Sequence, residues 1–362
     1  MQSLFEPFDL SNLALRNRMV MAPMTRTRAS EDGQPTPLMV NYYAQRASAG
    51  LIVTECTQVS DQGHGIIRAP GLHRDDQVAG WRSVVEAVHS AGGRIYCQLW
   101  HCGRVSHPDI LGGALPVAPS AIAAEGSFYL PSGPEVFPVP RVLGTEEIAG
   151  VVDDFGEAAE NAMAAGFDGV ELHGAFGYLP DQFLQSGTNQ RTDAYGGSVA
   201  NRARLMLEIV EVLAEVWGVE RVGVKLSPSS RHYGMFDSDA LATFSHVIGE
   251  LDTMRVGYLH LMEPNLTDLK RGTVQIERVV ETFRQITSVP IIANGGFDQT
   301  KAQAVLDAGT AELVSFGVPF LANPDLPIRF QRGAPLNTPD PSTFYGEGPR
   351  GYTDYPTLSV PA

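Results

Sequence analysis

Polar residues that could take part in chemistry lie close behind several short apolar runs of the chain. His173 ends one run and Tyr178 follows it, Lys225 lies near the end of a second run, and Gln98 lies within a third. Such side chains can hydrogen-bond a bound molecule, and a lysine can instead form a Schiff base. A lone histidine at a strand end is also commonly a packed core residue. The convergence of several such residues is therefore more informative than any one of them.

A glycine-rich turn, Asn294-Gly295-Gly296, precedes a predicted helix that begins at Thr300. Glycines let backbone N–H groups approach an anion closely, and the N-terminus of a following helix adds positive potential. Gly317 follows the next apolar run, so a second glycine-containing loop comes after the first. The pattern indicates a phosphate-binding site, and an ordinary tight turn is the alternative.

Alternating strands and helices must position these residues. Each predicted strand is short and bounded by Gly, Pro or polar residues, which is typical of strands buried on both faces. The predicted strands are Arg18–Ala22, Leu51–Thr57, Arg94–Leu99, Gly169–His173, Val222–Leu226, Tyr258–Met262, Val289–Ala293 and Leu313–Phe316. The predicted helices are Thr36–Ser48, Asp76–Ala91, Thr145–Ala165, Asn201–Trp217, Ser238–Met254, Ile276–Thr287, Thr300–Ala308 and Asn323–Gly333. Eight such units predict an α/β fold, a parallel TIM (β/α)8 barrel, with a doubly wound sheet as the alternative.

A barrel of this kind carries its chemistry at the carboxyl ends of its strands. The residues there include Pro23, Met24, Thr25, Cys56, Gln98, Trp100, His173, Lys225, Asn294 and Gly317. Two long connections interrupt the alternation: an excursion at about residues 103–144 and a Pro-rich, non-helical tail from about residue 335. We expect residues 1–362 to form one domain.

Composition narrows the class of partner. The chain has 362 residues, with 26 Lys and Arg against 41 Asp and Glu, a net charge of −15. An acidic balance argues against nucleic acid as a partner, because phosphate contacts need clustered basic residues.

No apolar run approaches the roughly 18–20 residues of a membrane helix, and no signal peptide is visible. The odd cysteine count, without metal-ligand spacing, indicates a reducing, cytoplasmic setting and no metal site. We expect a monomer or homodimer.

Ordered motifs along nearly the whole chain resemble the Old Yellow Enzyme family of FMN-dependent ene-reductases, especially its bacterial branch. The motifs are Asn17-Arg18-Met19-Val20-Met21-Ala22-Pro23-Met24-Thr25-Arg26, Gln98-Leu99-Trp100-His101-Cys102-Gly103-Arg104, Gly169-Val170-Glu171-Leu172-His173, Asn189-Gln190-Arg191-Thr192-Asp193, Tyr195-Gly196-Gly197-Ser198 and Asn323-Pro324-Asp325-Leu326. The tail segments Phe344-Tyr345-Gly346 and Gly351-Tyr352-Thr353-Asp354-Tyr355-Pro356 are similar to the same branch.

The resemblance implies a TIM barrel that holds FMN non-covalently at the carboxyl ends of its strands. It implies that Thr25 hydrogen-bonds the flavin O4, that Gln98 binds the pyrimidine edge, and that Pro23, Met24 and Cys56 line the ring. It assigns a hydrogen bond to the substrate oxygen to His173, and proton donation to Tyr178. Trp100 and Tyr345 would form walls of the substrate pocket.

The implied reaction reduces the C=C bond of α,β-unsaturated carbonyl or nitro compounds, and nitrate esters are a further class of acceptor. NADPH or NADH reduces the flavin first, leaves, and is replaced by the alkene. Hydride addition to the β-carbon builds negative charge on the carbonyl oxygen, so a donor there stabilises the transition state more than the ground state. A phenol can then protonate the α-carbon.

Three positions depart from the family pattern. Phe176 stands where the family has a second His or Asn donor, which predicts weaker polarisation of simple enones, unless His173 and a water suffice. Lys225 replaces an arginine near flavin N1 and O2 and keeps the charge without the planar fork. Val318 replaces the arginine on the FMN phosphate, which leaves the backbone of Asn294, Gly295, Gly296, Gly317 and Val318 to hold it. We therefore expect weaker FMN binding than in relatives.

Other functions remain open on the sequence. Phe176 favours a flavin-dependent isomerase or a biosynthetic reductase with a narrow substrate. Lys225 is compatible with a non-redox barrel enzyme that forms a Schiff base. A non-catalytic flavin-binding protein is a further alternative, against which the presence of both His173 and Tyr178 argues.

Overall fold

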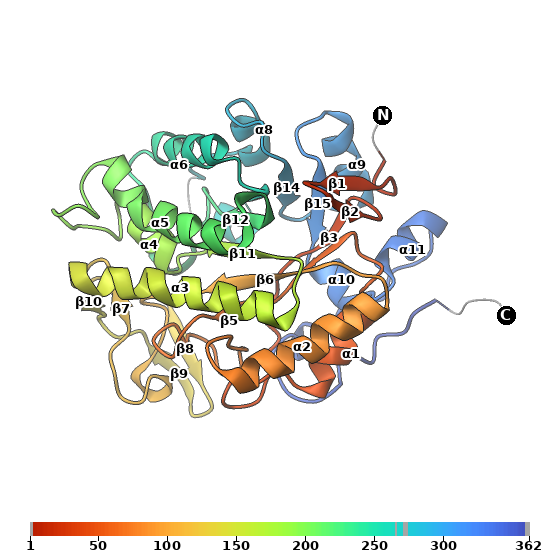
Figure 1. Ribbon diagram of the computed structural model, residues 1–362, viewed down its shortest axis with the longest axis horizontal. Coiled ribbons are helices and arrows are strands. Elements are labelled where there is room, and N and C mark those ends of the chain that lie inside the picture. Colours follow the sequence, from red (N-terminus) through yellow and green to blue (C-terminus); the bar gives the residue numbers. More distant parts are fainter. Residues whose placement is uncertain (1–2, 265, 271–273, 359–362) are drawn as a thin grey trace.

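A closed parallel β-barrel lies at the centre of the computed structural model, which describes residues 3–264, 266–270 and 274–358 (Figure 1). Within these residues, eight strands form the barrel: β3 (Met19–Met21), β4 (Leu51–Val53), β6 (Ile95–Trp100), β11 (Gly169–Gly174), β12 (Val222–Leu226), β13 (Tyr258–Met262), β14 (Ile291–Asn294) and β15 (Leu313–Phe316). Each strand pairs in parallel with the next in this order, and pairing of β15 with β3 completes the ring. β5 (Thr57–Gln58) extends the pairing alongside β6. The TIM barrel predicted from the sequence is confirmed.

Helices surround the barrel, because each buries one apolar face against it. The helices are α1 (Pro37–Gln45), α2 (Asp75–Ser90), α3 (Thr145–Ala165), α4 (Leu179–Leu184), α5 (Val199–Trp217), α6 (Ala240–Met254), α7 (Leu266–Lys270), α8 (Val279–Arg284), α9 (Gln299–Asp307), α10 (Val318–Ala322) and α11 (Leu326–Arg332). In α3 the residues Ile148, Val151, Phe155 and Ala162 are buried at helical spacing. Gly166, at φ 90°, ends this helix in the left-handed conformation.

The barrel interior is apolar at its amino-terminal end. Side chains from β3, β4, β6, β13, β14 and β15 form one cluster there, which includes Tyr96 and Tyr258. The hairpin of β1 (Phe8–Leu10) and β2 (Leu13–Leu15) adds Leu10, Leu13 and Leu15 to the same cluster. The hairpin therefore closes this end of the barrel, and only the opposite end is left for a site.

The excursion contains more regular structure than its composition indicates. It holds the 3-10 turn η1 (Pro108–Ile110), the parallel pair β7 (Val117–Ala118) and β10 (Arg141–Val142), and the antiparallel hairpin of β8 (Ser127–Leu130) and β9 (Gly133–Val136). Arg104 fixes the segment by donating to the carbonyls of Ile122 (3.1 Å) and Tyr233 (2.8 Å). Phe128 and Phe137 turn inward and pack with Trp100 and Tyr178.

The C-terminal tail crosses back over the chain that follows β3. Arg26 donates to the carbonyls of Phe344 (2.9 Å) and Gly351 (2.7 Å), and Arg28 donates to those of Thr343 (3.0 Å) and Arg350 (3.1 Å). Within its described part, to residue 358, the tail carries no α-helix and one 3-10 turn, η4 (Pro341–Thr343). In Figure 1 the tail and the β8–β9 hairpin lie on the lower side of the molecule, and β1 and β2 lie on the upper side.

Several predicted boundaries are wrong by a few residues, for identifiable reasons. The predicted strand Leu51–Thr57 divides into β4 and β5, because the Thr54 hydroxyl accepts the Gln98 N–H (2.9 Å) in place of a backbone carbonyl. The predicted helix Ile276–Thr287 is only α8, whose first N–H groups at Val279 and Val280 donate to the Glu263 carboxylate. The predicted helix Asn323–Gly333 begins only at Leu326. The remaining strands and helices start or end within three residues of their predicted positions.

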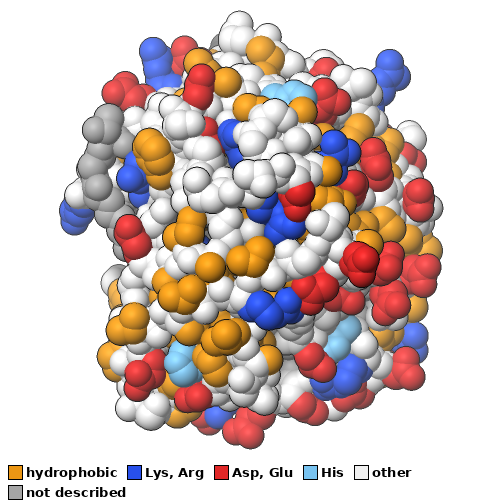
Figure 2. Space-filling model, turned by 90° about the vertical axis from the view of Figure 1, so that its left-hand side faces the viewer, with side chains coloured by type: hydrophobic (Ala, Val, Ile, Leu, Met, Phe, Trp, Pro, Cys, Tyr) orange, Lys and Arg blue, Asp and Glu red, His pale blue; other side chains and the backbone are white. Residues whose placement is uncertain are grey.

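On the face in Figure 2, Lys and Arg side chains lie scattered among acidic and uncharged ones. None of the described helices is long and apolar enough to cross a membrane. Among the described residues, no group of three or more His, Cys, Asp or Glu side chains is arranged to hold a metal ion. Two further 3-10 turns, η2 (Val219–Arg221) and η3 (His232–Gly234), flank β12.

Candidate active site at the carboxyl end of the barrel

The predicted site residues lie at or just beyond the carboxyl ends of the barrel strands. Pro23, Met24 and Thr25 follow β3, and Cys56 follows β4. Gln98 and Trp100 end β6, His173 lies near the end of β11, and Lys225 lies near the end of β12. Asn294, Gly295 and Gly296 end and follow β14, and Gly317 and Val318 follow β15. Because parallel strands point the same way, all of these residues share one end of the barrel.

His173, Tyr178 and Trp100 form a contiguous group. The rings of His173 and Tyr178 are 4.9 Å apart and nearly perpendicular, and those of Tyr178 and Trp100 are 5.1 Å apart in an edge-on arrangement. All three residues are buried. Tyr178 is the N-cap residue of α4, so it is placed by the turn between β11 and that helix. The structure therefore brings together the predicted hydrogen-bond donor, proton donor and pocket wall.

Burial determines the protonation of this pair. Burial, and next the charge of Lys225, lower the pKa of His173 to about 3, so the imidazole is neutral at physiological pH. Burial and the neighbouring Tyr233 raise the pKa of Tyr178 well above its usual value, so the phenol keeps its proton. Both residues can therefore act as neutral hydrogen-bond donors.

Phe176 occupies a strained backbone position beside His173. Its φ is +57°, a region that Asn and His tolerate better than a bulky aromatic residue. Its N–H donates to the Ser227 hydroxyl at 2.8 Å, which holds the turn in place. Its ring lies 6.1 Å from that of His173 and 5.6 Å from that of His232. A phenyl ring thus stands where the family pattern has a polar donor.

The Lys225 side chain is largely buried, and no hydrogen bond from its ammonium to another described residue is found. Lys225 is 3% exposed, and its ammonium lies 5.6 Å from the centre of the Phe176 ring. Burial lowers the pKa of Lys225, and the charge of Glu171 opposes that shift. A buried cation that lacks a direct partner is unusual in a folded protein, so the site is suited to an anionic or electron-rich ligand.

Cys56, Gln98 and Thr25 follow or lie on the neighbouring strands β4, β6 and β3 of the barrel. The Cys56 thiol donates to the Gln98 Oε1 at 3.5 Å, and the Thr25 side chain hydrogen-bonds the same thiol. Burial raises the pKa of Cys56 to about 12, so it remains a thiol. Cys56, Cys97 and Cys102 are all buried and free.

The loops after β3 and β15 meet at Met24 and Gly317. A Cβ atom added to Gly317 would lie 3.0 Å from the Met24 Sδ, so a larger residue would displace Met24. Val318 begins α10 and is 37% exposed. The position therefore has room for the longer side chain that the family pattern carries there.

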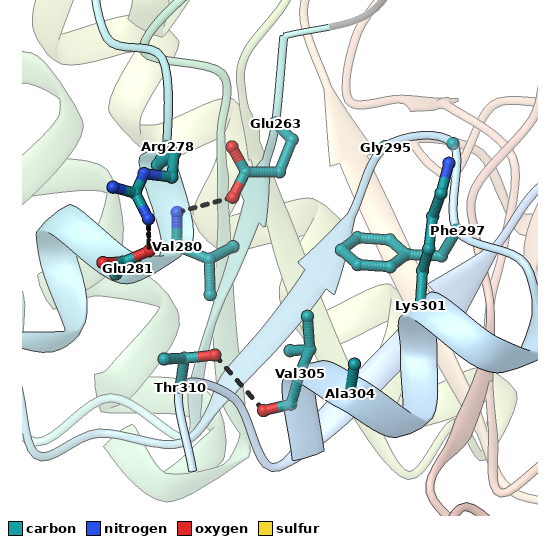
Figure 3. A pocket seen from close by; sticks show the side chains of 11 residues that line it. Glu263, Arg278, Val280, Glu281, Gly295, Phe297, Lys301, Ala304, Val305 and Thr310 are labelled. Carbon is teal, nitrogen blue, oxygen red and sulfur yellow. Dashed lines mark hydrogen bonds and ion pairs between the residues drawn. The ribbon is translucent and has the colours of Figure 1, made fainter. Parts of the chain in front are cut away.

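The backbone of the Asn294-Gly295-Gly296 turn has positive φ angles at both glycines, which only glycine adopts readily. Gly295 has φ +118° and packs against Glu263, and Gly296 has φ +66° with open space at its Cβ position. A cavity of about 380 Å³ adjoins this turn between α8 and α9, where Lys301 rises from α9 toward Gly295 (Figure 3). Of the predicted site residues, Gly295 and Gly296 line this cavity. It is therefore separate from the space beside His173 and Tyr178.

Tyr345 is carried to the site by the tail. Thr27 exchanges hydrogen bonds with the backbone of Gly346, which fixes the segment next to Tyr345. Tyr345 is 66% exposed, and Tyr178 and Cys56 lie in its neighbourhood. The predicted pocket wall thus depends on residues at both ends of the chain.

Glu171, His260 and Ser315, which the sequence did not indicate as functional residues, join Gln98 and Asn294 in a buried polar layer inside the barrel. Gln98 donates to the Glu171 carboxylate at 2.7 Å, and His260 contacts the other oxygen of Glu171 at 2.8 Å. Ser315 links the far side of His260 to Asn294, with both contacts at 2.8 Å. The available signal was strand alternation, because Glu171 lies two residues before His173 and must face the same interior.

Several polar atoms at this end of the barrel lack the partners that buried groups normally have. His173 Nδ1 and Trp100 Nε1 are buried without a hydrogen-bond partner, and the Lys225 ammonium has no direct partner among the described residues. The glycine turns after β14 and β15 leave backbone N–H groups near the same end. These features fit flavin mononucleotide, which has a planar ring with several acceptor atoms and a terminal phosphate.

Comparisons with known proteins agree with this geometry. Residues 3–337 match the NADH:flavin oxidoreductase / NADH oxidase family. The chain is 40% identical to 12-oxophytodienoate reductase 7 of Oryza sativa subsp. japonica, over 99% of this chain and 95% of that protein. It is 40% identical to a "probable flavin mononucleotide-dependent alkene reductase" of Leishmania infantum, over 98% of this chain and 97% of that protein.

Solved structures are similar over almost the whole chain. Morphinone reductase is 48% identical with a TM-score of 0.92, covering 99% of this chain and 96% of that one. The old yellow enzyme homologue from Zymomonas mobilis is 42% identical with a TM-score of 0.95, covering 98% of this chain and 100% of that one.

Proposed function

Because the chain belongs to the NADH:flavin oxidoreductase / NADH oxidase family, we propose that it is an FMN-dependent ene-reductase of activated alkenes. The predicted Old Yellow Enzyme relationship is confirmed by the family match and by the solved homologue. NAD(P)H is the reductant, and the substrate is a small molecule with a C=C bond conjugated to a carbonyl or nitro group. Nitrate esters belong to the same proposal as a further class of acceptor.

Residues at the barrel mouth would hold the cofactor at both of its ends. Bound FMN supplies an acceptor for the hydride of NAD(P)H and a donor of hydride to the alkene. Gln98 and Lys225 would bind the pyrimidine edge, Thr25 would bind O4, and Pro23, Met24 and Cys56 would line the ring. The phosphate would be held by the backbone of Asn294, Gly295, Gly296, Gly317 and Val318.

His173 would orient the substrate and stabilise the charge that develops on it. A neutral imidazole with a free nitrogen can donate a hydrogen bond to the carbonyl or nitro oxygen, where negative charge builds up. Tyr178 would then give its phenolic proton to the α-carbon. The alkene carbon farther from the activating group gains the hydride and the nearer carbon gains the proton, so the C=C bond becomes C–C.

The pairing of His173 with Tyr178 is the observation that supports the proposal most strongly. The two rings lie 4.9 Å apart at the carboxyl end of the barrel, both buried, and each can donate a hydrogen bond. Trp100 and Phe176 add apolar walls, and Tyr345 extends from the tail beside them. This arrangement suits a flat, mainly apolar acceptor with one activating group.

Phe176 favours a narrower form of the same activity. Its ring removes the second donor expected beside His173, so a simple enone is polarised from one side only. A biosynthetic substrate that carries its own second activating group is the alternative candidate that this residue supports.

Steady-state turnover under anaerobic conditions tests the proposal. The protein should contain FMN, and it should oxidise NADH or NADPH in step with saturation of cyclic enones or nitroalkenes, as measured by mass spectrometry of the products. A colourless protein that does not take up FMN and forms a borohydride-trapped adduct at Lys225 would support the Schiff-base alternative instead.

The setting of the enzyme forms part of the proposal. We infer a cytoplasmic, reducing environment, which three buried free thiols support. We further infer one structural unit over residues 1–362, a monomer or homodimer, and no nucleic-acid partner, for which the net charge of −15 is the support.

A further inference from the structure

The buried polar layer below the site forms a continuous hydrogen-bonded chain across the barrel. Gln98 of β6, Glu171 of β11, His260 of β13 and Ser315 of β15 follow one another at 2.7 to 2.8 Å. Each of the four is at most 2% exposed. Buried charges are costly unless they are paired and hydrogen-bonded, and here the hydrogen bonds from Gln98 and His260 offset the cost of burying Glu171.

The hydrogen positions in the chain follow from its chemistry. Burial alone would raise the pKa of Glu171, but His260, Lys225 and Gln98 together hold that pKa below its usual value. A carboxylate only accepts, so His260 Nδ1 carries the proton that it donates. Burial lowers the pKa of His260 against the opposing effect of Glu171, so Nε2 is free to accept from the Ser315 hydroxyl. Glu171 is thus the one anion of the chain.

Glu171 fixes the direction of the Gln98 amide. The Gln98 Nε2 donates to Glu171 at 2.7 Å, while its Oε1 faces the Cys56 thiol at 3.5 Å. A carboxylate cannot accept from an amide oxygen, so the flipped amide would place two acceptors in contact. The carbonyl end of Gln98 is therefore the end directed away from the layer and toward the site.

Glu171 also balances the unpaired ammonium of Lys225. The charged and titratable groups that face Lys225 are Glu171 and His173 of β11, His260 of β13, and Cys56 after β4. His173 and His260 are neutral and Cys56 is a thiol, so Glu171 is the anion among these four groups. No ion pair of 4 Å or less joins Glu171 to Lys225 within the described chain, which leaves the ammonium available to a ligand.

We propose that Glu171, held by His260 and Ser315, is the positioning residue for the pyrimidine end of the cofactor, because it orients the Gln98 amide and balances the Lys225 ammonium. This inference rests on the proposed function, in which Gln98 and Lys225 bind that end. Glu171 acts through these two residues and does not itself contact substrate.

Binding of FMN to the apoprotein, followed by flavin fluorescence, tests the role directly. Glu171→Gln keeps the shape of the side chain but removes its charge and lets the Gln98 amide flip. We expect FMN affinity to fall about tenfold, since a hydrogen bond to a charged group is lost. Asp237→Asn is the matched control: Asp237 is a buried carboxylate paired with Arg202 at 3.3 Å, and its loss should lower Tm and leave FMN affinity unchanged.

The pH profile of FMN affinity separates positioning from a general loss of structure. Without Glu171 the pKa of Lys225 falls further, so the affinity of Glu171→Gln should decline with rising pH at a lower pH than in the wild type. The double variant Glu171→Gln/Lys225→Met should lack this decline. If Glu171→Gln does not fold, His260→Gln provides the second test. His260 helps to lower the pKa of Glu171, so in His260→Gln the carboxylate takes up a proton at a higher pH than in the wild type. FMN affinity should then fall on the acid side of the pH profile.

Wild-type affinity and pH profiles in both Glu171→Gln and His260→Gln would overturn the inference. The inference would also be overturned if FMN affinity declined with rising pH in Glu171→Gln/Lys225→Met just as it does in Glu171→Gln. That result would show that Glu171 does not act through Lys225. A wild-type protein that does not bind FMN would contradict the proposed function instead, so the two failures are distinguishable.

Discussion

At the scale of single residues, the chemistry depends on how burial shifts the pKa of each titratable group. His173 and Tyr178 are both kept neutral by burial, so the site presents two hydrogen-bond donors to a substrate. Burial lowers the pKa of Lys225 near them, and the charge of Glu171 opposes this shift. The types of these residues were evident in the sequence, whereas their protonation states required the packing around them.

Phe176 is the residue at which a single substitution should improve the enzyme. Phe176→Asn places a donor beside His173 and also relieves the strained backbone at φ +57°, which Asn tolerates well. We expect kcat/KM for 2-cyclohexenone to rise at least tenfold, because a missing oxyanion donor costs on the order of 10²–10³ in rate. Phe176→Leu, which adds no donor, is the control. Unchanged or lower turnover in Phe176→Asn would refute the role assigned to this position.

At the scale of elements, the site is assembled from segments that are distant in sequence. The glycine turns after β14 and β15 and the strand ends of the barrel could be predicted, because apolar runs bounded by Gly and polar residues identify buried parallel strands. The tail and the β8–β9 hairpin could not be placed in this way. Their positions depend on side chains such as Arg26 and Arg104 that donate to backbone carbonyls far along the chain.

Arg26 should be the residue on which the position of the tail depends. Arg26→Met removes hydrogen bonds to Phe344, Gly351 and the Tyr42 hydroxyl. We expect a loss of about 3 kcal/mol in unfolding free energy, faster proteolysis of the tail, and a higher KM for the alkene because Tyr345 is no longer held. Arg82→Met is the control, since Arg82 is surface-exposed and, among the residues that the structure describes, donates to the Ala164 carbonyl alone. A protected tail with an unchanged KM in Arg26→Met would contradict this account.

At the scale of the whole molecule, the fold class and the family follow from the sequence, and the polar layer inside the barrel does not. Regular alternation of strands and helices defines the barrel without reference to side-chain contacts. The chain from Gln98 through Glu171 and His260 to Ser315 joins four strands, and such a contact depends on strand register. The motif that contains Glu171 predicts a buried strand, but it does not identify the residue that pairs with the Glu171 carboxylate.

Retention of FMN by the folded protein should be limited by Val318. Val318→Arg restores a charge-assisted hydrogen bond to the phosphate at an exposed position with room for the side chain. We expect the Kd for FMN to fall by about tenfold to a hundredfold, because such a bond contributes about 1.5–3 kcal/mol. Val318→Met serves as the uncharged control in the same fluorescence titration. Equal affinity in wild type and Val318→Arg would show that the backbone amides already suffice.

Glu55 should lower the free energy of unfolding as pH rises, whereas most carboxylates raise it. Burial raises the pKa of Glu55 to about 7, against hydrogen bonds from the Arg26 N–H and the Tyr43 hydroxyl. Between the unfolded value of 4.5 and about 7 the folded state binds more protons, so this group's contribution to stability falls as pH rises, by up to about 3 kcal/mol. Glu55→Gln should flatten the urea-unfolding profile between pH 5 and 7. An unchanged slope would remove Glu55 as its cause.

The central claim, that a flavin at the barrel mouth exchanges hydride with an alkene held by His173 and protonated by Tyr178, is tested most directly by anaerobic stopped-flow absorbance of the FMN-loaded protein. NADH or NADPH should bleach the flavin, and a cyclic enone should restore its colour with one equivalent of saturated ketone. Tyr178→Phe should bleach at the wild-type rate and recolour at least a hundredfold more slowly. A reduced flavin that no activated alkene reoxidises, or a Tyr178→Phe variant that recolours at the wild-type rate, would contradict the account.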